Sequence, residues 1–328
     1  IDDIEPLRTV AKNNKVLFDT IKLFSPATSY KASFQQPTGS RFGGDALYHG
    51  TNRPRGSRLS FYFNANYKPK NDSITNWDSL YMKIYDNQKL IRTLKKKVPE
   101  KSGIDYFYWY MDEKGIQWPS KKIKKSNYEP FGVKVLPGKF KVVLEYGNLK
   151  SEQIIEVKND PRIELDSEKE KEIYKTLKQL ESYQKITSNI TRQLAQSKEI
   201  AINHQELLDK FNKEKFKENI ELTKKTINEI DILFELIFGK EDKRQGITAE
   251  PSSNLLLRLS STQQYVSSRQ NGITQTEKIL IKQLKKDLKD IIIKFNNFFK
   301  QDWIKFKSST EAVDLSPFKE IEFFEIKE

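Results

Sequence analysis

Two groups of side chains in this sequence have types and spacing that suit ligand binding. Aromatic rings stack on sugar rings, bases and apolar partner surfaces, and lysine side chains attract anionic groups. The aromatic group lies in the run GIDYFYWYM at residues 103–111, and the basic group follows within residues 118–125. Together they supply nine candidate residues for a ligand or partner surface: Tyr106, Tyr108, Trp109, Tyr110, Trp118, Lys121, Lys122, Lys124 and Lys125.

The alternation within the aromatic run predicts a β-strand with two different faces. Tyr106, Tyr108 and Tyr110 would share one face of the sheet, and Phe107 and Trp109 would share the other. Such a strand commonly has one face in the core and one at an interface with a partner. We therefore expect a protein interface on this strand, ahead of a platform for stacking sugars.

Catalytic chemistry has little support in the sequence. His49 and His204 are the two histidines, and neither has a second ligand residue at metal-binding spacing or a neighbouring G-x-S-x-G element. We therefore predict no metal, no cofactor and no histidine-based catalysis. A glycoside hydrolase that uses Asp105 or Asp112 in a cleft remains an alternative, because such enzymes need a pair of carboxyl groups across the sugar.

Composition narrows the class of protein further. The 328 residues suggest about two domains, and the absence of cysteine excludes disulfides and thiolate metal sites. No apolar run approaches the ~18 residues of a membrane span. Because the chain begins at Ile1 rather than Met, we expect a mature product after cleavage or a piece of a longer protein.

The net charge of +13 comes from 58 basic and 45 acidic residues, so the surface is mixed as well as basic. A lysine-rich solvated surface accounts for this balance. A polyanionic partner is the alternative, and nucleic acid ranks lowest because the basic loop lacks the stacking motif of an RNA-binding fold.

Turn and strand signals predict a β module over residues 58–162. Pro137-Gly138 and Gly147-Asn148 bracket alternating apolar residues, which indicates a hairpin over residues 140–157. A second hairpin joins residues 79–85 to residues 89–94. With further strands at residues 59–63 and 103–111, the pattern favours an antiparallel β-sandwich of immunoglobulin (fibronectin III-like) type without a disulfide.

Before this module, residues 1–57 form a lead segment. Residues 1–8 are predicted as a strand end that runs into a turn, and residues 19–23 as a short strand. Five glycines and two prolines between residues 35 and 57 indicate a loop.

After Pro161 the apolar spacing becomes helical. Residues 163–313 are predicted to form an antiparallel bundle of three or four helices, which places this chain in the α+β multidomain class. The first helix is capped at Asp166-Ser167, the second runs from Gln205 to Phe238, the third begins at Leu255, and Thr274 caps the fourth. The tail at residues 314–328 is predicted as a short strand.

Several short segments, taken in order, resemble a bacterial family. They are IDDIEPLR at residues 1–8, LFSPATSY at 23–30, IYDNQKLIRTL at 84–94, LPGKFKVVL at 136–144 and VKNDPR at 157–162. The order is similar to that in the C-terminal region of sortilin-like or BNR-repeat glycosyl hydrolase-type proteins of Bacteroidota. The resemblance implies a β-propeller that ends near Ile1, followed by an immunoglobulin-like domain and a helical region.

The resemblance also implies that the hydrolase or peptide-binding site of the family lies in the propeller, upstream of this chain. We therefore expect a non-catalytic accessory or interaction module of a periplasmic, outer-membrane-surface or secreted protein. Its partner would be the upstream propeller or another envelope protein. The alternative, a carbohydrate-binding accessory module, requires Trp109, Tyr110 and Trp118 to be exposed together.

Overall fold

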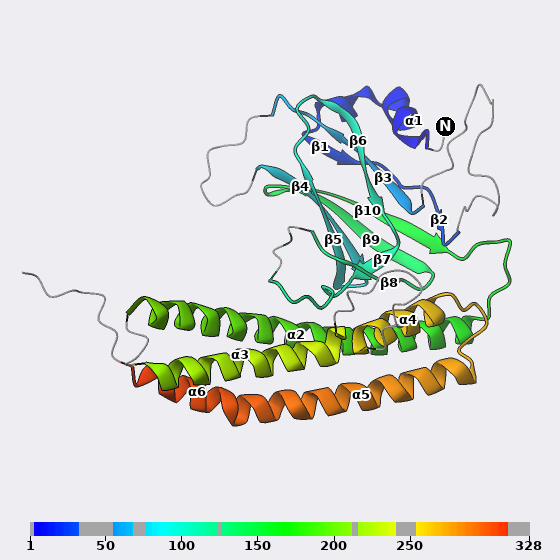
Figure 1. Ribbon diagram of the computed structural model, residues 1–328. Helices are drawn as coiled ribbons and strands as arrows, with labels where there is room; N and C mark the ends of the chain where they lie inside the picture. Colours follow the sequence, from blue (N-terminus) through cyan, green and yellow to red (C-terminus); the bar gives the residue numbers. More distant parts are fainter. Residues whose placement is uncertain are drawn as a thin grey trace, which may run out of the picture. The chain divides into compact units, whose positions relative to one another are not determined.

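The computed structural model describes residues 3–32, 55–67, 77–123, 126, 128–211, 216–240 and 254–313. The chain is a mixed α+β protein with several sheets and a helical region (Figure 1). Its contacts divide it into two units, which are described separately below. Unit 1 comprises the described parts of Ile1–Gln117, Lys125–Ser182 and Gln263–Lys278; unit 2 comprises those of Trp118–Lys124, Tyr183–Thr262 and Ile279–Glu328.

The larger sheet of unit 1 contains both predicted hairpins. Its strand order is β2-β10-β9-β4-β5, with all neighbours antiparallel except the parallel pair β2 and β10. The β4–β5 hairpin turns at Asn87, which has a φ of 53°. The strands are β2 (Ser29–Tyr30), β4 (Ser79–Asp86), β5 (Lys89–Lys97), β9 (Gly138–Tyr146) and β10 (Leu149–Lys158).

The second sheet has the antiparallel order β1-β3-β6, in which β6 contains the predicted aromatic strand. Its strands are β1 (Ile21–Leu23), β3 (Ser57–Phe63) and β6 (Gly103–Trp109). Among the described residues, β5 is the last strand of the larger sheet and β6 is the last strand of this one. Each therefore has one edge without a neighbouring strand.

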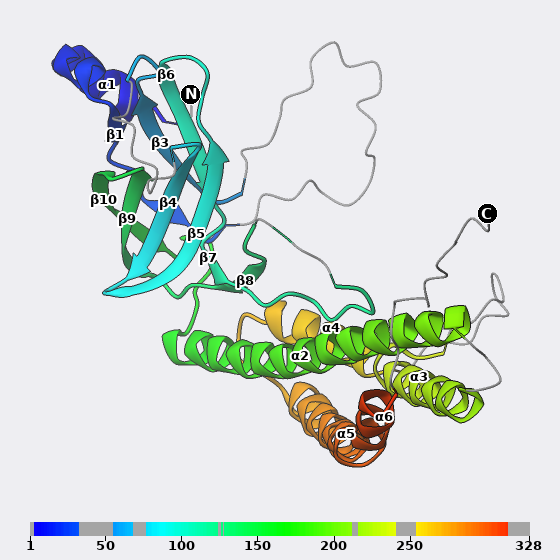
Figure 2. The same ribbon diagram turned by 90° about the vertical axis from the view of Figure 1, so that its left-hand side faces the viewer.

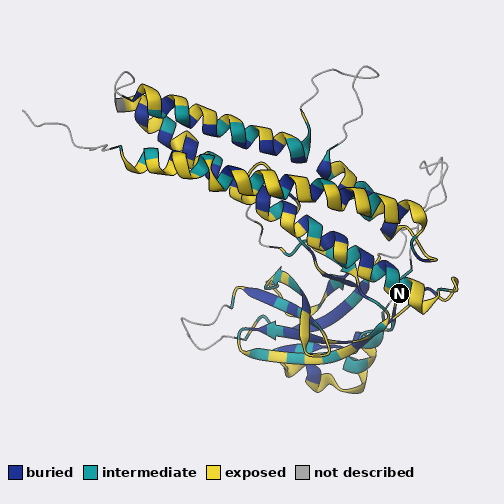
Figure 3. Cartoon of the chain, turned by 90° about the horizontal axis from the view of Figure 1, so that it is seen from below, coloured by how far each residue is buried: buried dark blue, intermediate teal, exposed yellow. Residues whose placement is uncertain are grey.

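The two sheets share one hydrophobic core. Apolar side chains alternate inward along the strands, and each fully buried one contributes about 1.5–3 kcal/mol relative to an exposed position. Figure 3 shows the buried residues running along the strands. Fully buried members from both sheets include Leu59, Phe61, Leu80, Met82, Leu144 and Ile155.

A third, two-stranded sheet pairs β7 (Asp112–Lys114) with β8 (Phe131–Lys134), which the sequence analysis did not predict. Two glycines let these backbones approach closely. A Cβ added at Gly115 would lie 2.0 Å from the carbonyl oxygen of Phe131, and one at Gly132 would lie 2.5 Å from that of Glu113. Any other residue at either position would force the strands apart.

The start of the chain differs from the prediction. In place of a strand end and turn, residues Glu5–Lys12 form α1, followed by the short helix η1 (Asn14–Phe18). Pro6 suits the first turn of a helix because its φ is already helical and its missing N–H would have no partner there. The Asp3 carboxylate accepts a hydrogen bond from the Glu5 N–H at 3.1 Å, which satisfies a donor at the helix start.

The helices begin largely where their caps predict. Asp166 accepts a hydrogen bond from the Glu168 N–H at 2.9 Å, and Gly239, with a φ of 80°, ends α3. The helices are α2 (Ser167–Phe211), α3 (Lys217–Phe238), α4 (Leu255–Ser267), α5 (Gln275–Lys300) and α6 (Asp302–Glu311).

The predicted start of the second helix at Gln205 is wrong. Ala201, His204 and Leu208 continue the buried stripe of α2 at three- and four-residue steps, so the same helix runs on to Phe211. The next helix, α3, begins at Lys217.

Side chains join the helices within unit 2. Lys198 of α2 forms an ion pair of 2.5 Å with Asp231 of α3, and the imidazole of His204 lies edge-on to Phe306 of α6. Figure 2 shows the course of these helices, and Figure 3 shows buried and exposed residues along them. In the described part of the chain, no helix is long and apolar enough to cross a membrane. The predicted tail strand and most of the glycine-rich loop lie outside the described residues.

Candidate functional site

The aromatic strand has the two faces that its sequence predicts. Phe107 and Trp109 are buried in the core of unit 1, whereas Tyr106 and Tyr110 are about 40% exposed. The structure corrects the inclusion of Trp109 among the surface candidates: its side chain is 0% exposed, and its indole N–H donates to the Asp112 carbonyl at 2.9 Å. Trp109 is therefore a core residue and is unavailable to a ligand.

A pocket of about 540 Å³ lies beside the unpaired edges of β5 and β6. We call it the aromatic pocket, because its walls contain Tyr81, Phe107, Tyr108, Tyr110, Tyr128 and Phe131. Four residues of β5 (Arg92, Thr93, Leu94 and Lys95) and Glu129 also line it. Two of the rings are largely open, since Tyr128 is 71% exposed and Phe131 is 68% exposed.

Arg92 holds the segment that carries these exposed rings. Its side chain is only 4% exposed, and its guanidinium donates to the carbonyl oxygens of Glu113, Glu129 and Pro130, the Glu129 bond measuring 3.2 Å. Its central carbon lies 5.4 Å from the centre of the Phe131 ring. Arg92 thus holds in place the backbone of the segment that carries Tyr128 and Phe131.

Asp112 is the counter-charge of Arg92. Its carboxylate is 1% exposed, lies 3.6 Å from the guanidinium, and accepts a hydrogen bond from the Gly132 N–H at 3.2 Å. Burial raises the pKa of Asp112, although Arg92 and the Gly132 bond act in the opposite direction. Asp112 Oδ1 and Arg92 Nε are both buried without a hydrogen-bond partner, so this ion pair is incompletely satisfied.

The tyrosines nearer the middle of β6 are already engaged by neighbouring side chains. The guanidinium of Arg58 lies 4.4 Å from the Tyr106 ring centre, and the Lys96 amine lies 5.5 Å from it. Tyr106 and Tyr108 also contact each other edge-to-face at 5.1 Å. The ring most free to receive a ligand is therefore that of Tyr128, with Phe131 beside it.

The edges of β5 and β6 differ in how their backbone groups are satisfied. On β6, the Tyr106 N–H donates to Asp105 at 2.8 Å, and Lys96 donates to the Tyr106 carbonyl at 3.2 Å. On β5, the Thr93 N–H donates to the Glu129 carboxylate at 2.8 Å. Within the described residues, no backbone group pairs with the rest of this β5 edge.

The predicted surface residues are divided between the two units. Trp118, Lys121 and Lys122 belong to unit 2, where the Lys121 amine lies 5.5 Å from the Phe238 ring centre. Lys124 and Lys125 lie outside the described residues. The tyrosines of β6 belong to unit 1, so only the aromatic half of the predicted surface contributes to the pocket.

The candidate catalytic residues have other contacts. His204 is buried against Phe306, and burial lowers its pKa; His49 lies outside the described residues. Asp105 forms an ion pair of 2.5 Å with Lys96, and neither it nor Asp112 lines the aromatic pocket. Nowhere in the described ranges do three His, Cys, Asp or Glu residues gather as metal ligands would.

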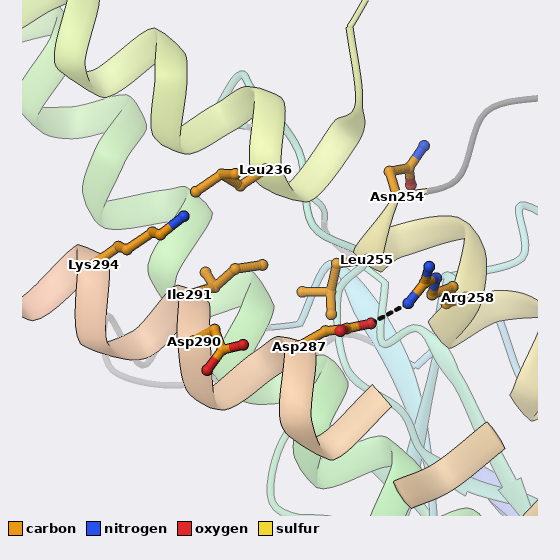
Figure 4. A pocket seen from close by; sticks show the side chains of 8 residues that line it. All are labelled: Leu236, Asn254, Leu255, Arg258, Asp287, Asp290, Ile291 and Lys294. Atoms are coloured by element: carbon orange, nitrogen blue, oxygen red, sulfur yellow. Dashed lines mark hydrogen bonds and ion pairs between the residues drawn. The ribbon is translucent and has the colours of Figure 1, made fainter. Parts of the chain in front are cut away.

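Figure 4 shows a second hollow, of about 240 Å³, between α3, α4 and α5 of unit 2. It is lined by two basic residues, Arg258 and Lys294, and by two acidic residues, Asp287 and Asp290. Arg258 is already paired with Asp287. Because the charges balance, the hollow favours neither an anionic nor a cationic ligand.

Comparisons with known proteins add little to this geometry. No family model and no curated protein matches the chain. A solved structure named pT26-6p matches at 12% identity with a TM-score of 0.17. The match covers 78% of this chain and 46% of that one, so this chain corresponds to less than half of that structure, and so low a TM-score carries no argument about the fold.

Sequence reasoning found the tyrosines but missed the residues that build the pocket around them. Arg92 lies opposite Ile84 in the β4–β5 register, at an inward-facing position where the strand pattern predicts an apolar residue. A charged residue at such a position could have indicated the site, because a buried arginine needs hydrogen-bond or charge partners nearby.

Proposed function

We propose that this chain is a non-catalytic interaction module that holds a protein partner in the aromatic pocket of unit 1. The observation that carries the proposal is the pocket itself: about 540 Å³, lined by six aromatic rings, and supported by a buried arginine. Tyrosine is enriched at the centres of protein interfaces because its large rigid ring buries much apolar area and loses little conformational entropy.

Exposed apolar rings supply the driving force for such binding. Covering apolar surface contributes about 25 cal/mol per Å². Tyr128 and Phe131 are the most exposed rings of the pocket, and Tyr110 contacts Phe131 edge-to-face at 5.4 Å. A partner that covers these three rings would gain from each, while Arg92 limits the entropy lost in ordering them.

The finer architecture belongs to the same proposal. Two largely antiparallel sheets around one core support an immunoglobulin-like β-sandwich, and the successive long helices support an antiparallel bundle. The segments shared with sortilin-like, BNR-repeat proteins support a role beside a β-propeller at the cell envelope or outside the cell. In that setting the partner is the propeller or another envelope protein.

The test uses a randomised display library of peptides of about ten residues, a typical upper length for one strand. The full chain should select peptides whose binding is lost in Tyr128→Ala and Phe131→Ala, as measured by calorimetry. Phe18→Ala is the matched control, because Phe18 is 81% exposed and does not line the pocket. Selected peptides that bind both pocket variants as tightly as the wild type would contradict the proposal.

Carbohydrate binding is the second candidate, because the same pocket offers four tyrosine hydroxyl groups beside open rings. Trp109 cannot take part, since it is buried. Titration with neutral and acidic oligosaccharides, followed by calorimetry, separates the candidates: heat that disappears in Tyr128→Ala would favour a glycan. Peptide binding without any glycan heat would favour the protein partner.

A further inference from the structure

The outer edge of β5 offers backbone groups for pairing. Thr93 lies opposite Lys83 of β4, and its N–H points away from β4 to the Glu129 carboxylate. Backbone groups alternate in direction along a strand, so those of Lys95 and Lys97 point the same way as those of Thr93. The next N–H, that of Val98, points back and donates to the Asp78 carbonyl at 3.3 Å, as this alternation requires.

The side chains along this edge have two distinct characters. Lys95 and Lys97 lie on the outer face of the sheet, opposite Tyr81 and Ser79, and both are exposed. Neither forms an ion pair with another described residue. Leu94 lies on the inner face, and both Leu94 and Lys95 line the aromatic pocket.

We infer that β5 is a docking strand for an extended peptide segment in which acidic residues alternate with apolar ones. The segment would pair with residues 95–97, set its acidic side chains against Lys95 and Lys97, and place its apolar side chains in the aromatic pocket. Strand addition gains affinity from main-chain hydrogen bonds and specificity from alternate side chains. The inference rests on the proposed function and specifies its partner.

The structure already contains one example of the predicted chemistry. The Glu129 carboxylate accepts from the Thr93 N–H, the position at which the carbonyl of an added strand would accept. A neighbouring strand places opposed side chains with their Cβ atoms about 4.5–5.5 Å apart, close enough for a carboxylate to meet each lysine. The adjacent edge of β6 lacks this opening at Tyr106, because Asp105 and Lys96 satisfy its backbone.

A second copy of this chain fits the edge less well. β5 carries Lys89, Arg92, Lys95, Lys96 and Lys97, and no acidic residue. Antiparallel pairing of two β5 strands would bring these like charges together, which is destabilising. Lysines are also a common protection of edge strands against self-association.

The first test is the sequence pattern of the selected peptides. Selection on the full chain should enrich segments with acidic residues at every second position and apolar residues between them. Enrichment of basic or proline-rich peptides would overturn the inference. A chain that forms a dimer in sedimentation, dissociated by Lys95→Glu with Lys97→Glu, would assign the edge to a second copy and also overturn it.

The second test is N-methylation of a selected peptide. Methyl groups on the amides that face β5 should weaken binding at least about tenfold, because each removes a donor and adds bulk at the strand edge. The same groups on the intervening amides are the matched control and should have little effect. If methylation of the facing amides and of the intervening amides weakened binding equally, strand pairing would be overturned.

Charge reversal completes the design. Lys95→Glu with Lys97→Glu should weaken binding about tenfold. Lys12→Glu with Lys15→Glu changes the net charge equally at exposed positions of α1 and η1 and should leave binding unchanged. Peptides whose binding depends on Tyr128 and Phe131 but is unaffected by N-methylation and charge reversal would support the proposed function and overturn the docking strand. If the library yields no peptide whose binding depends on the pocket, both the proposed function and the docking strand would be overturned.

Discussion

Two carboxylates in unit 1 have almost no exposed surface and both face an arginine, yet their pKa values shift in opposite directions. Asp112, which is paired with Arg92, is 1% exposed, and burial raises its pKa. Glu277, at the start of α5, is 0% exposed, and hydrogen bonds from Thr274 and Arg269 lower its pKa to about 2.

The difference lies in the number of donors. Glu277 accepts from the Thr274 N–H at 2.7 Å, from the Thr274 hydroxyl, and from two nitrogens of Arg269. Asp112 has one backbone donor at 3.2 Å and an arginine at 3.6 Å, and its Oδ1 has no partner. A difference in depth adds to this: Asp112 lies deep in unit 1, where burial is the largest influence on its pKa, whereas Glu277 lies close to the surface, where hydrogen bonds are the largest influence.

Loss of Arg92 should have the largest effect. Arg92→Met leaves Asp112 as an uncompensated buried charge and removes three donors to backbone carbonyls. The free energy of unfolding, measured by urea denaturation, should fall by about 3–5 kcal/mol. In the double variant with Asp112→Asn the loss should be smaller, since the unpaired charge is gone. A loss for Arg92→Met below about 1 kcal/mol would mean that water reaches the site.

Removal of Glu277 should have the next largest effect. At the N-terminus of α5, the Glu277 carboxylate accepts from the backbone N–H and the hydroxyl of Thr274, as in one half of a capping box, so Glu277→Ala leaves both donors without their acceptor. We expect the free energy of unfolding to fall by about 1–2 kcal/mol, and Glu277→Gln to recover part of the loss because glutamine can also accept. Equal losses in the two variants would speak against the capping role.

Removal of the arginine that faces Glu277 should cost less than removal of the one that faces Asp112. The Arg269 side chain is 40% exposed. When Arg269 is replaced, Glu277 still accepts both hydrogen bonds from Thr274. Arg269→Met should therefore lower the free energy of unfolding by less than about 1 kcal/mol. If the losses for Arg269→Met and Arg92→Met were equal in the same urea experiment, the comparison of the two sites would be wrong.

Effects of opposite sign should appear as the pH changes. The pKa of folded Glu277 is lowered from 4.5 to about 2, so its stabilising contribution is present above pH 4.5 and is lost as the pH falls towards 2. The pKa of folded Asp112 is raised above 3.8, so the folded state holds its proton more tightly, and its contribution is lost as the pH rises through that raised value. Unfolding of Glu277→Gln and Asp112→Asn, each compared with the wild type between about pH 3 and pH 6, should give differences that change in opposite directions. Parallel trends would refute the comparison.

Sequence periodicity was sufficient for elements whose pattern is local. Both hairpins, the starts of two helices and the end of a third lie where turn residues and caps predict them, because Asp166, Thr274 and Gly239 act within one helical turn of their targets. The start of the chain was mispredicted, since Pro6 suits both a turn and a first helical turn and only the wider context decides.

The candidate site was predictable only in part, because its construction is non-local. The alternation of Tyr106, Phe107 and Trp109 fixes which rings face the core. Arg92, however, gains its role from carbonyls some 20 to 40 residues further along the chain, at Glu113 and Glu129. No periodic pattern encodes such contacts.

The close approach of β7 and β8 also has an evolutionary consequence. A Cβ at Gly115 or Gly132 would collide with the opposite backbone, so nearly every single-codon change at either position would be selected against. Tyr128 and Phe131, in contrast, are largely exposed. Among relatives of this chain, we expect the two glycines to persist together while Tyr128 and Phe131 vary, which would make the glycine pair a more reliable marker of descent than the aromatic pocket.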